Sequence, residues 1–322
     1  MSGRDGVTFA QPVLSEFDVK LTPPDISPWI AGNIGLPGFT VLRSPLPGPH
    51  VAIIALIHGN EIAGAILLDR LLREQIRPLR GTLTLGFANI AAFARFDPTQ
   101  PTASRFVDED LNRVWAIDVL DGSRDTCETA RARAMRRHFD TVDVLLDLHS
   151  MLWPSDPLML CGATAKGRAM AEAIGAPDLI VADQGHVSGK RLIDYGTFAA
   201  TNTSAMANLV EAGQHWQQAT VAMTERVTMS LLGQYGMISP PPPTPTTPRV
   251  AEVSHAITAV TASFAFVQTF RGGDIVERRN TLIAMDGTTE IRTPYDNCLL
   301  VMPSLRPSRG HTAVRLARFV GC

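Results

Sequence analysis

The clearest hydrophobic pattern in the chain is a run of seven apolar residues at 51–57, which stops at His58 and a Gly-Asn pair. Such a run predicts a buried central strand, and it is too short to span a membrane. Beyond Glu61 the period changes, and apolar residues recur at helical spacing over 62–76. Open α/β sheets place their ligands at such a strand-to-helix switch. His58 and Glu61 are therefore candidate site residues on one polar bend.

A second, mostly apolar run at 142–148 also leads into a histidine, His149. Two histidines and a glutamate from the ends of two core strands match a catalytic zinc site that keeps an open position for water. The alternative for the first bend is a solvated surface turn, whose glutamate is favoured there by the dipole of the following helix. Asp147 shares a strand face with His149 and is a candidate acceptor for its second ring N–H, or else a local strand-end cap.

Outside these two runs, strands and helices are predicted to alternate. The predicted strands are 82–89, 158–161, 179–182 and 208–211, and the predicted helices are 126–139, 165–174 and a long one from near His215 to 234. This alternation favours a doubly wound α/β sheet. Prolines punctuate residues 1–50, which predicts short edge strands. Residues 91–110 show little periodicity and are predicted to form a long functional loop.

A sharp change in composition divides the chain. Residues 239–248 contain six prolines, which predicts an extended, semi-rigid linker. Beyond it, short alternating runs are separated by Gly and Asp turns. We therefore expect a catalytic α/β domain at 1–236, a Pro-rich linker at 237–250 and a small all-β domain at 251–322.

Composition removes several classes of function. The net charge of −2 and the pI of about 6.4 give no electrostatic case for binding nucleic acid or an anionic membrane. The arginines of the predicted helix 126–139 are therefore interpreted as a solvated face, and His138 as structural. Four scattered cysteines fit a reducing compartment, and no apolar segment of a secretory signal follows the first residues. We expect a cytoplasmic protein.

Four short motifs occur along the chain in a fixed order: His58-Gly-Asn-Glu61, Asp110-Leu-Asn112-Arg113, Asp147-Leu-His149 and Val210-Glu211-Ala-Gly213. Together they resemble the succinylglutamate desuccinylase/aspartoacylase family, a branch of the carboxypeptidase A-like zinc hydrolases. The resemblance covers roughly residues 50–215. It implies a mixed α/β sheet of the zinc carboxypeptidase type, followed by a C-terminal β domain. It also implies a zinc-dependent hydrolase that removes an acyl group from an amino acid nitrogen.

The resemblance implies roles for the candidate residues. One zinc ion per chain would be held by His58, Glu61 and His149. Glu211 would be the general base that takes a proton from zinc-bound water and returns it to the departing amine. From the pattern alone, the favoured explanation of Glu211 is the acidic start of the next helix. His215, just beyond, is interpreted as a helix-start residue and not as a ligand.

The resemblance also assigns a charged loop segment. In the family an arginine seven positions before the Asn of Asp-Leu-Asn-Arg binds substrate, and Arg105 has this spacing from Asn112. Arg105, Asn112 and Arg113 would bind the substrate, and Arg113 would also stabilise the oxyanion. Asp108 and Asp110 would hold the arginines in place. The alternative is a solvated cluster of nearly balanced charges.

Other functions remain to be weighed against a deacylase. A zinc carboxypeptidase acting on short peptides is the main alternative, and the spelling of the motifs weighs moderately against it. A non-catalytic zinc protein would be expected to have lost Glu211 or a ligand. A lipoyl- or biotinyl-type carrier needs an exposed lysine in its β domain, and the lysines of this chain are only Lys20, Lys166 and Lys190. The carrier hypothesis therefore fails.

The expected partner is a small N-acyl substrate, and the sequence is also compatible with a homo-oligomer. In aspartoacylase a further arginine, roughly ten residues before the general base, helps to recognise substrate carboxylates. Here that position is Thr201, in a stretch without a cation. Lys190 and Arg191 could reach the substrate from another direction, or form a solvated loop tip. We therefore predict that N-acetyl-aspartate and succinyl-glutamate are poor substrates, and that neutral or basic side chains are preferred.

Overall fold

The structure is a computed structural model that describes residues 17–186, 188–239 and 247–321. Contacts divide it into two compact units. We call residues 18–152 and 157–250 the α/β unit, and the segments 153–156 and 251–321, with Phe17, the β unit. Much of the predicted linker, 240–246, and residues 1–16 lie outside the described residues.

The strands of the α/β unit are β1 (Phe39–Arg43), β2 (His50–Ala55), β3 (Thr82–Phe87), β4 (Val144–Met151), β5 (Leu158–Leu160), β6 (Leu179–Ala182) and β7 (Met206–Gln214). Its α-helices are α1 (Ile62–Arg73), α2 (Ile90–Phe93), α3 (Ile117–Asp121), α4 (Cys127–Phe139), α5 (Ala165–Ile174), α6 (Gly196–Ala199) and α7 (Gln218–Gln234). Short 3₁₀ turns are η1 (Ser27–Trp29), η2 (Leu111–Arg113) and η3 (Leu192–Asp194).

The sheet of the α/β unit has the strand order β1-β3-β2-β4-β7-β5-β6. Strands β3, β2, β4 and β7 run parallel, whereas β1 and β5 pair antiparallel with β3 and β7. The predicted α/β class with a mixed sheet is thus confirmed. Because parallel strands point the same way, the bend after β2 and the end of β4 lie at one edge of the sheet.

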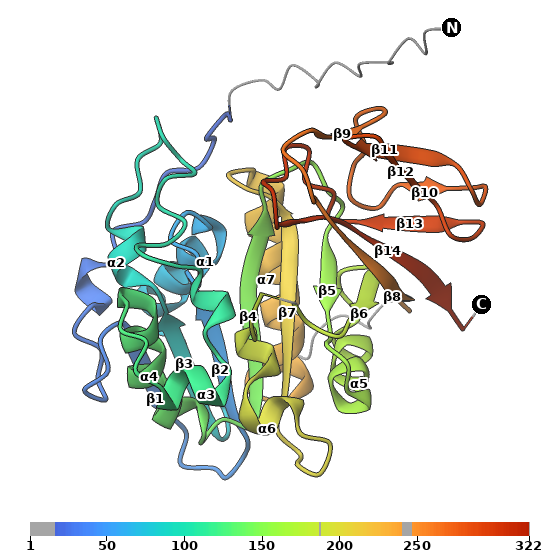
Figure 1. Cartoon of the computed structure of the whole chain (residues 1–322). Coiled ribbons are helices and arrows are strands. Elements are labelled where there is room, and N and C mark those ends of the chain that lie inside the picture. Colours follow the sequence, from blue (N-terminus) through green and yellow to red (C-terminus); the bar gives the residue numbers. More distant parts are fainter. Residues whose placement is uncertain (1–16, 187, 240–246, 322) are drawn as a thin grey trace, which may run out of the picture. The chain divides into compact units, whose positions relative to one another are not determined.

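Helices cover both faces of this sheet. Helix α7 packs on β4 and β7 and contacts both α1 and α5, so these three form one layer (Figure 1). Helix α1 connects β2 to β3, and α4 lies in the connection from β3 to β4, which crosses the sheet in the opposite direction. Because such connections are right-handed, α4 lies on the face of the sheet opposite to α1. Ile53 and Ile54 of β2 have no exposed surface between the layers. The predicted buried central strand is therefore confirmed.

Several elements differ from their predicted ranges. Helix α1 ends at Arg73, because Gln75 takes a left-handed φ of 55° that no helix continues. The predicted long loop contains a short helix, α2, which is capped by the side chain of Asn89. Strand β7 does not stop at Glu211 but continues to Gln214, because β4 continues beside it and pairs Met151 with Gln214.

The described elements of the β unit are strands. They are β8 (Arg249–Thr258, entered from the α/β unit), β9 (Phe264–Phe266), β10 (Ile275–Val276), β11 (Leu282–Asp286), β12 (Thr289–Arg292), β13 (Cys298–Val301) and β14 (Thr312–Val320). Two neighbour orders connect them, β8-β14-β13-β10 and β12-β11-β9.

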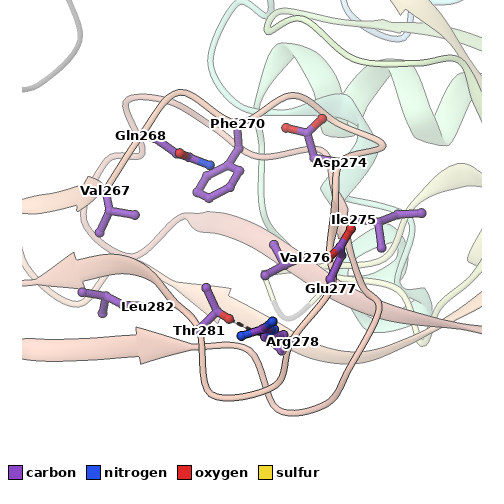
Figure 2. Close-up of a pocket in the computed structure, with 10 residues that line it drawn as sticks. All are labelled: Val267, Gln268, Phe270, Asp274, Ile275, Val276, Glu277, Arg278, Thr281 and Leu282. Carbon is purple, nitrogen blue, oxygen red and sulfur yellow. Dashed lines mark hydrogen bonds between the residues drawn. The ribbon is translucent and has the colours of Figure 1, made fainter.

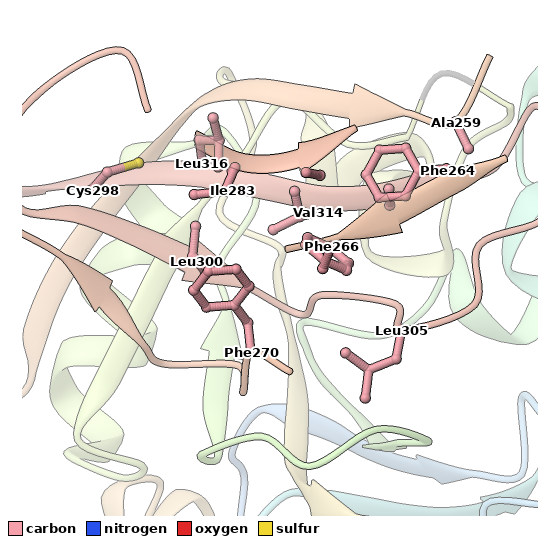
Figure 3. Close-up of a cluster of buried hydrophobic side chains, with 12 residues drawn as sticks. Ala259, Phe264, Phe266, Phe270, Ile283, Cys298, Leu300, Leu305, Val314 and Leu316 are labelled. Carbon is pink, nitrogen blue, oxygen red and sulfur yellow. The ribbon is translucent and has the colours of Figure 1, made fainter. Parts of the chain in front are cut away.

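The core of the β unit is an aromatic cluster (Figure 3). Phe264, Phe266 and Phe270 meet edge to face, with ring centroids 5.2 and 5.8 Å apart, a geometry that aromatic quadrupoles favour. Trp153, from the connection between β4 and β5, packs against this cluster and donates from Nε1 to Ser304 Oγ at 3.3 Å. The short segment 153–156 therefore belongs to the β unit and not to the sheet it interrupts.

The β unit also has a hollow of about 550 Å³ (Figure 2). Its polar lining includes Asp274, Glu277 and Arg278, and neither histidine nor cysteine lines it. It therefore lacks the imidazole and thiolate ligands of a typical zinc site. Among the helices of the described residues, none is both long enough and apolar enough to cross a membrane.

Candidate active site

The bend after β2 is held by its backbone. Leu56 has a left-handed φ of 61°, which turns the chain out of the strand. A Cβ on Gly59 would come within 2.5 Å of backbone atoms of Ala92 and Ser104, so only glycine fits there. Gly59 N also donates to Arg105 O at 3.0 Å. The bend is therefore packed under the loop that carries the predicted substrate arginine.

His58, Glu61 and His149 converge at this bend. His58 Nδ1 lies 2.7 Å from Glu61 Oε1, and His149 Nδ1 lies 3.0 Å from Glu61 Oε2. One ligand atom from each residue lies within 4.8 Å of the others. The three residues are 3%, 3% and 4% exposed. Burial excludes the alternative of a solvated surface turn.

The electrostatics of this cluster favour a cation. Burial alone would raise the pKa of Glu61, but the adjacent His58 and His149 outweigh it and hold that pKa well below its usual value. Burial opposes protonation of His149, yet the carboxylates of Asp147 and Glu61 raise its pKa well above the usual range. The attraction of the carboxylates for a positive charge here exceeds the cost of removing that charge from water. A buried metal cation requires such an environment.

The outer nitrogens of both imidazoles face carboxylates. His58 Nε2 lies 2.9 Å from Asp110 Oδ1, and His149 Nε2 lies 2.9 Å from Asp147 Oδ2. The structure thus places Asp147 beside the second ring nitrogen of His149, as expected from their shared strand face. The Asp147 carboxylate has no well-aligned hydrogen bond within the described chain. Such outer partners fix the ring orientation of metal-binding histidines.

Glu211 lies beside this cluster on β7, where its Cα is paired with that of His149. It is 7% exposed, and within the described chain its Oε2 is buried without a hydrogen-bond partner. Burial, and then repulsion by Glu61, raise the pKa of Glu211 to about 8. An unpaired buried carboxylate oxygen is costly unless a ligand or water completes it.

Arg105 and Arg113 approach the same cluster from the loop before and after Asp110. Arg105 Nη1 lies 3.2 Å from Glu61 Oε1, and its Nη2 lies 2.9 Å from His58 Nε2 and 3.4 Å from Asp110 Oδ2. Arg113 Nη2 lies 3.9 Å from the same oxygen of Asp110. Asp110 therefore holds both arginines, as expected.

Asn112 is buried behind these arginines. Its Oδ1 accepts a hydrogen bond from Leu192 N at 2.9 Å, which ties η2 to η3. Asn112 therefore fixes the segment that carries Arg113. Its direct contact with substrate stays a prediction.

The chain matches the family model described as the succinylglutamate desuccinylase/aspartoacylase catalytic domain over residues 47–232, which is more than half of its 322 residues. The chain belongs to the succinylglutamate desuccinylase/aspartoacylase family. The enzymes that give this family its name are deacylating hydrolases, so membership supports a deacylating hydrolase. No curated protein matches the chain significantly.

Solved structures of the family share the fold at low sequence identity. Succinylglutamate desuccinylase from Vibrio parahaemolyticus is 17% identical, with a TM-score of 0.68 over 88% of this chain and 87% of that one. The enzyme from Vibrio cholerae is 16% identical, with a TM-score of 0.70 over 88% and 86%. A succinylglutamate desuccinylase/aspartoacylase from Rhodobacter sphaeroides is 19% identical, with a TM-score of 0.62 over 88% and 89%.

The candidate active site also contains two polar contacts that no sequence motif predicts. His215 Nδ1 lies 2.6 Å from Ser150 Oγ, and Ser150 N donates to Glu61 Oε2 at 3.0 Å. His215 is therefore not a helix-start residue, since α7 begins at Gln218. Burial lowers its pKa to about 4, so the ring is neutral near pH 7.

A buried glutamate of α4 anchors the substrate loop. Glu128 has no exposed surface, and its carboxylate accepts the backbone N–H groups of Val107, Asp108 and Glu109 at 2.7, 3.0 and 3.2 Å. The expectation that Asp108 holds an arginine is wrong. Its Oδ2 instead accepts from Cys127 N at 2.7 Å, at the first residue of α4, where an acidic side chain is favoured.

One expectation about substrate cations also needs correction. Arg191 is not a solvated loop tip, because it is 3% exposed and its guanidinium binds Asp183 and Asp194. Thr201 lies before β7, which begins at Met206. The substrate preference inferred from the missing cation at Thr201 stays a prediction.

Proposed function

We propose that the chain is a zinc-dependent deacylase that hydrolyses the amide bond of a small N-acylated amino acid or a similar small molecule. The observation that carries the proposal is the buried convergence of His58, Glu61 and His149, beside the unpaired Oε2 of Glu211. A sheet of the zinc carboxypeptidase type, an all-β C-terminal domain and one zinc ion per chain belong to the same proposal.

The donor set fits zinc. Two imidazoles and one carboxylate, with room for water, are the ligands of hydrolytic zinc enzymes. Asp110 and Asp147 beside the outer nitrogens would select the tautomers that leave both Nδ1 atoms free to bind the metal. When bound there, zinc would polarise an amide carbonyl and lower the pKa of water.

Glu211 is proposed as the general base. A divalent cation nearby would lower its pKa from about 8 and favour the ionised carboxylate. The carboxylate would accept a proton from water as the water oxygen bonds to the acyl carbon. The protonated Glu211 would then donate that proton to the amine nitrogen as the C–N bond breaks. The products are a carboxylate and a free amine.

Arg105 and Arg113 are proposed to bind the substrate. Their side chains are 37% and 22% exposed, so an incoming molecule can reach both. Arg105, which the carboxylates of Asp110 and Glu61 hold in place, would bind a substrate carboxylate, and Arg113 would stabilise the charge that develops on the carbonyl oxygen.

Lys190 is an exposed lysine in the loop before η3. Its backbone oxygen accepts from Trp115 N at 3.2 Å, which places the loop beside η2. The predicted preference for substrates with neutral or basic side chains assumes that no second cation of the protein binds a substrate carboxylate. Replacing Lys190 by Met tests this assumption. If Lys190 does not bind the substrate, the turnover of N-acetyl-aspartate should not change.

The decisive experiment is a panel of N-acyl amino acids and short peptides, assayed on the zinc-loaded protein and on Glu211→Gln. We expect turnover of at least one N-acyl amino acid and little of any peptide. Turnover of peptides with a free C-terminal carboxylate, and of no N-acyl amino acid, would favour the carboxypeptidase alternative. Turnover of neither would overturn the proposal.

A further inference from the structure

A second cavity lies at the opposite edge of the α/β sheet. Its volume is about 760 Å³, and its walls come from the first residues of β2 and β3, the last residue of β1, the loop before β1 and the end of α4. The full length of β2, six residues or roughly 17–20 Å, separates it from the bend at His58. Ligands of open α/β sheets bind at the carboxyl ends of strands, so this cavity is not part of the catalytic site.

The cavity is lined by cations. Arg43 and Arg137 contribute guanidinium groups, and His50 and His138 contribute imidazoles, whereas no carboxylate lines it. A carboxylate outside the lining, that of Asp143, accepts a hydrogen bond from His50 N at 2.8 Å. Two fixed positive charges therefore face this space without a compensating acid.

The two arginines differ from their neighbours on α4. Arg131 and Arg133 donate to backbone carbonyl groups, and Arg136 pairs with Asp121. Within the described chain, neither the guanidinium of Arg137 nor that of Arg43 has a hydrogen bond or an ion pair. The three neighbouring arginines of α4 thus bind groups of the protein itself, whereas Arg43 and Arg137 remain available to bind a ligand.

The backbone adds donors to the same wall. Within the described chain, the N–H groups of Ile34, Gly35 and Leu36 donate no hydrogen bond, although all three residues line the cavity. Gly35 has a left-handed φ of 73°, and no atom lies within 4 Å of where its Cβ would be. Consecutive free N–H groups around a left-handed residue are a common anion-binding arrangement.

Hydrogen bonds link the two histidines through the hydroxyl group of Thr84. His50 Nδ1 donates to Thr141 O at 2.9 Å, so its Nε2 accepts from Thr84 Oγ1 at 2.8 Å, and Thr84 Oγ1 accepts from His138 Nε2 at 3.0 Å. Both rings are neutral in this arrangement. Burial first, and then His50 and Arg43, lower the pKa of His138 to about 4. Arg43 therefore contributes to this lowering, and no carboxylate is among the residues that line the cavity.

We propose that this cavity binds a small oxyanion, a phosphate or a carboxylate, through Arg43, Arg137 and the backbone N–H groups of 34–36. Guanidinium groups and backbone donors are the groups that recognise both kinds of oxyanion. The site is non-catalytic, because the whole of β2 separates it from the metal cluster. Its occupant would stabilise the folded α/β unit in proportion to its concentration.

The test is titration calorimetry of the full chain with inorganic phosphate and, separately, with citrate. We expect saturable binding of at least one of them with a 1:1 stoichiometry. Arg43→Gln and Arg137→Gln should each weaken it about tenfold or more, the usual loss of one charged hydrogen-bond partner. Both side chains are exposed, so the variants should fold, which their melting temperatures will verify.

Two control variants make the result decisive. Arg226→Gln removes an exposed arginine of α7 that lines neither site and should leave binding unchanged. Arg113→Gln alters the catalytic site and should also leave it unchanged. Loss of binding in Arg113→Gln would place the anion at the catalytic site, and equal weakening in Arg226→Gln would make the effect one of net charge. Either result, or no saturable binding of phosphate or citrate, overturns the proposal.

Discussion

The two edges of the α/β sheet carry the same number of histidines and arginines but differ in their acidic residues. The catalytic edge has two histidines and two arginines, His58, His149, Arg105 and Arg113, and so has the opposite edge, with His50, His138, Arg43 and Arg137. Four carboxylates join the first group, those of Glu61, Asp110, Asp147 and Glu211. No carboxylate lines the cavity of the second.

This difference in acids decides what each edge can bind. At the catalytic edge the carboxylates raise the pKa of His149 and leave an oxygen of Glu211 unpaired, so an added cation is stabilised. At the opposite edge burial, and to a smaller extent Arg43, lower the pKa of both histidines. Two arginines and no carboxylate line the cavity there, so an added anion is stabilised. Histidine and arginine content alone therefore does not identify a metal site.

The largest effect should follow from removing a metal ligand. We expect His149→Ala to reduce bound zinc from about one ion per chain to almost none and to abolish turnover, because two donors hold zinc poorly. Elemental analysis after dialysis measures the zinc content. His138→Gln, a histidine of the opposite edge, is the matched control and should keep its zinc. Full zinc content in His149→Ala would show that the metal site is elsewhere or does not exist.

The next largest effect should come from Glu211→Gln. The amide keeps the shape of the side chain but cannot take a proton from water, so turnover should fall roughly 100-fold or more. The zinc content should not change, because Glu211 is not a proposed ligand. Steady-state kinetics and elemental analysis on the same sample measure both quantities. Activity within a few-fold of the original would exclude Glu211 as the base.

The sequence was sufficient to find the residues that follow apolar runs. His58 and His149 each end such a run, and Glu61 starts the next helix, so periodicity alone singled them out. Glu211 needed the family resemblance, because β7 continues three residues beyond it and no strand end marks it. The position of a residue inside a strand depends on the length of its partner strand, which no local pattern contains.

Contacts between distant polar side chains could not be predicted. Ser150 and His215 are 65 residues apart in sequence, and Thr84 and His138 are 54 apart. Each pair forms because a helix or strand of fixed register brings a short polar side chain within reach. The role of Glu128 is similar, since its three backbone donors carry no side-chain signature. Such contacts follow from the fold and not from motifs.

A smaller effect should follow from Asp147→Asn. Asp147 lies 2.9 Å from His149 Nε2. A neutral amide in its place would accept the ring N–H more weakly, so His149 would bind the metal less tightly. Loss of such an outer carboxylate usually weakens metal binding about 10–100-fold. Competition with a chelator of known affinity measures the change. Unchanged affinity would mean that the backbone of β4 alone orients His149.

The smallest effect concerns acid stability at the opposite edge. The pKa of His138 is lowered to about 4 by burial and then by His50 and Arg43, whereas in the unfolded chain it is about 6.5. The folded state therefore binds fewer protons than the unfolded state between these values. The contribution is complete above pH 6.5 and is lost as the pH falls toward 4.

Replacing His138 by Gln should therefore flatten the fall in stability below pH 6.5. One proton changes the free energy of unfolding by at most about 1.4 kcal/mol per pH unit, and less here because His138 is partly exposed. Urea unfolding at pH 7.5, 6 and 5 measures the slope, with the exposed His311→Gln as a control. Saturating phosphate should also reduce the slope, because a bound anion offsets Arg43 and favours protonated His138. An identical slope in His138→Gln would show that the uncompensated charge of this edge does not reach the histidine, and the contrast between the two edges would then rest on the catalytic site alone.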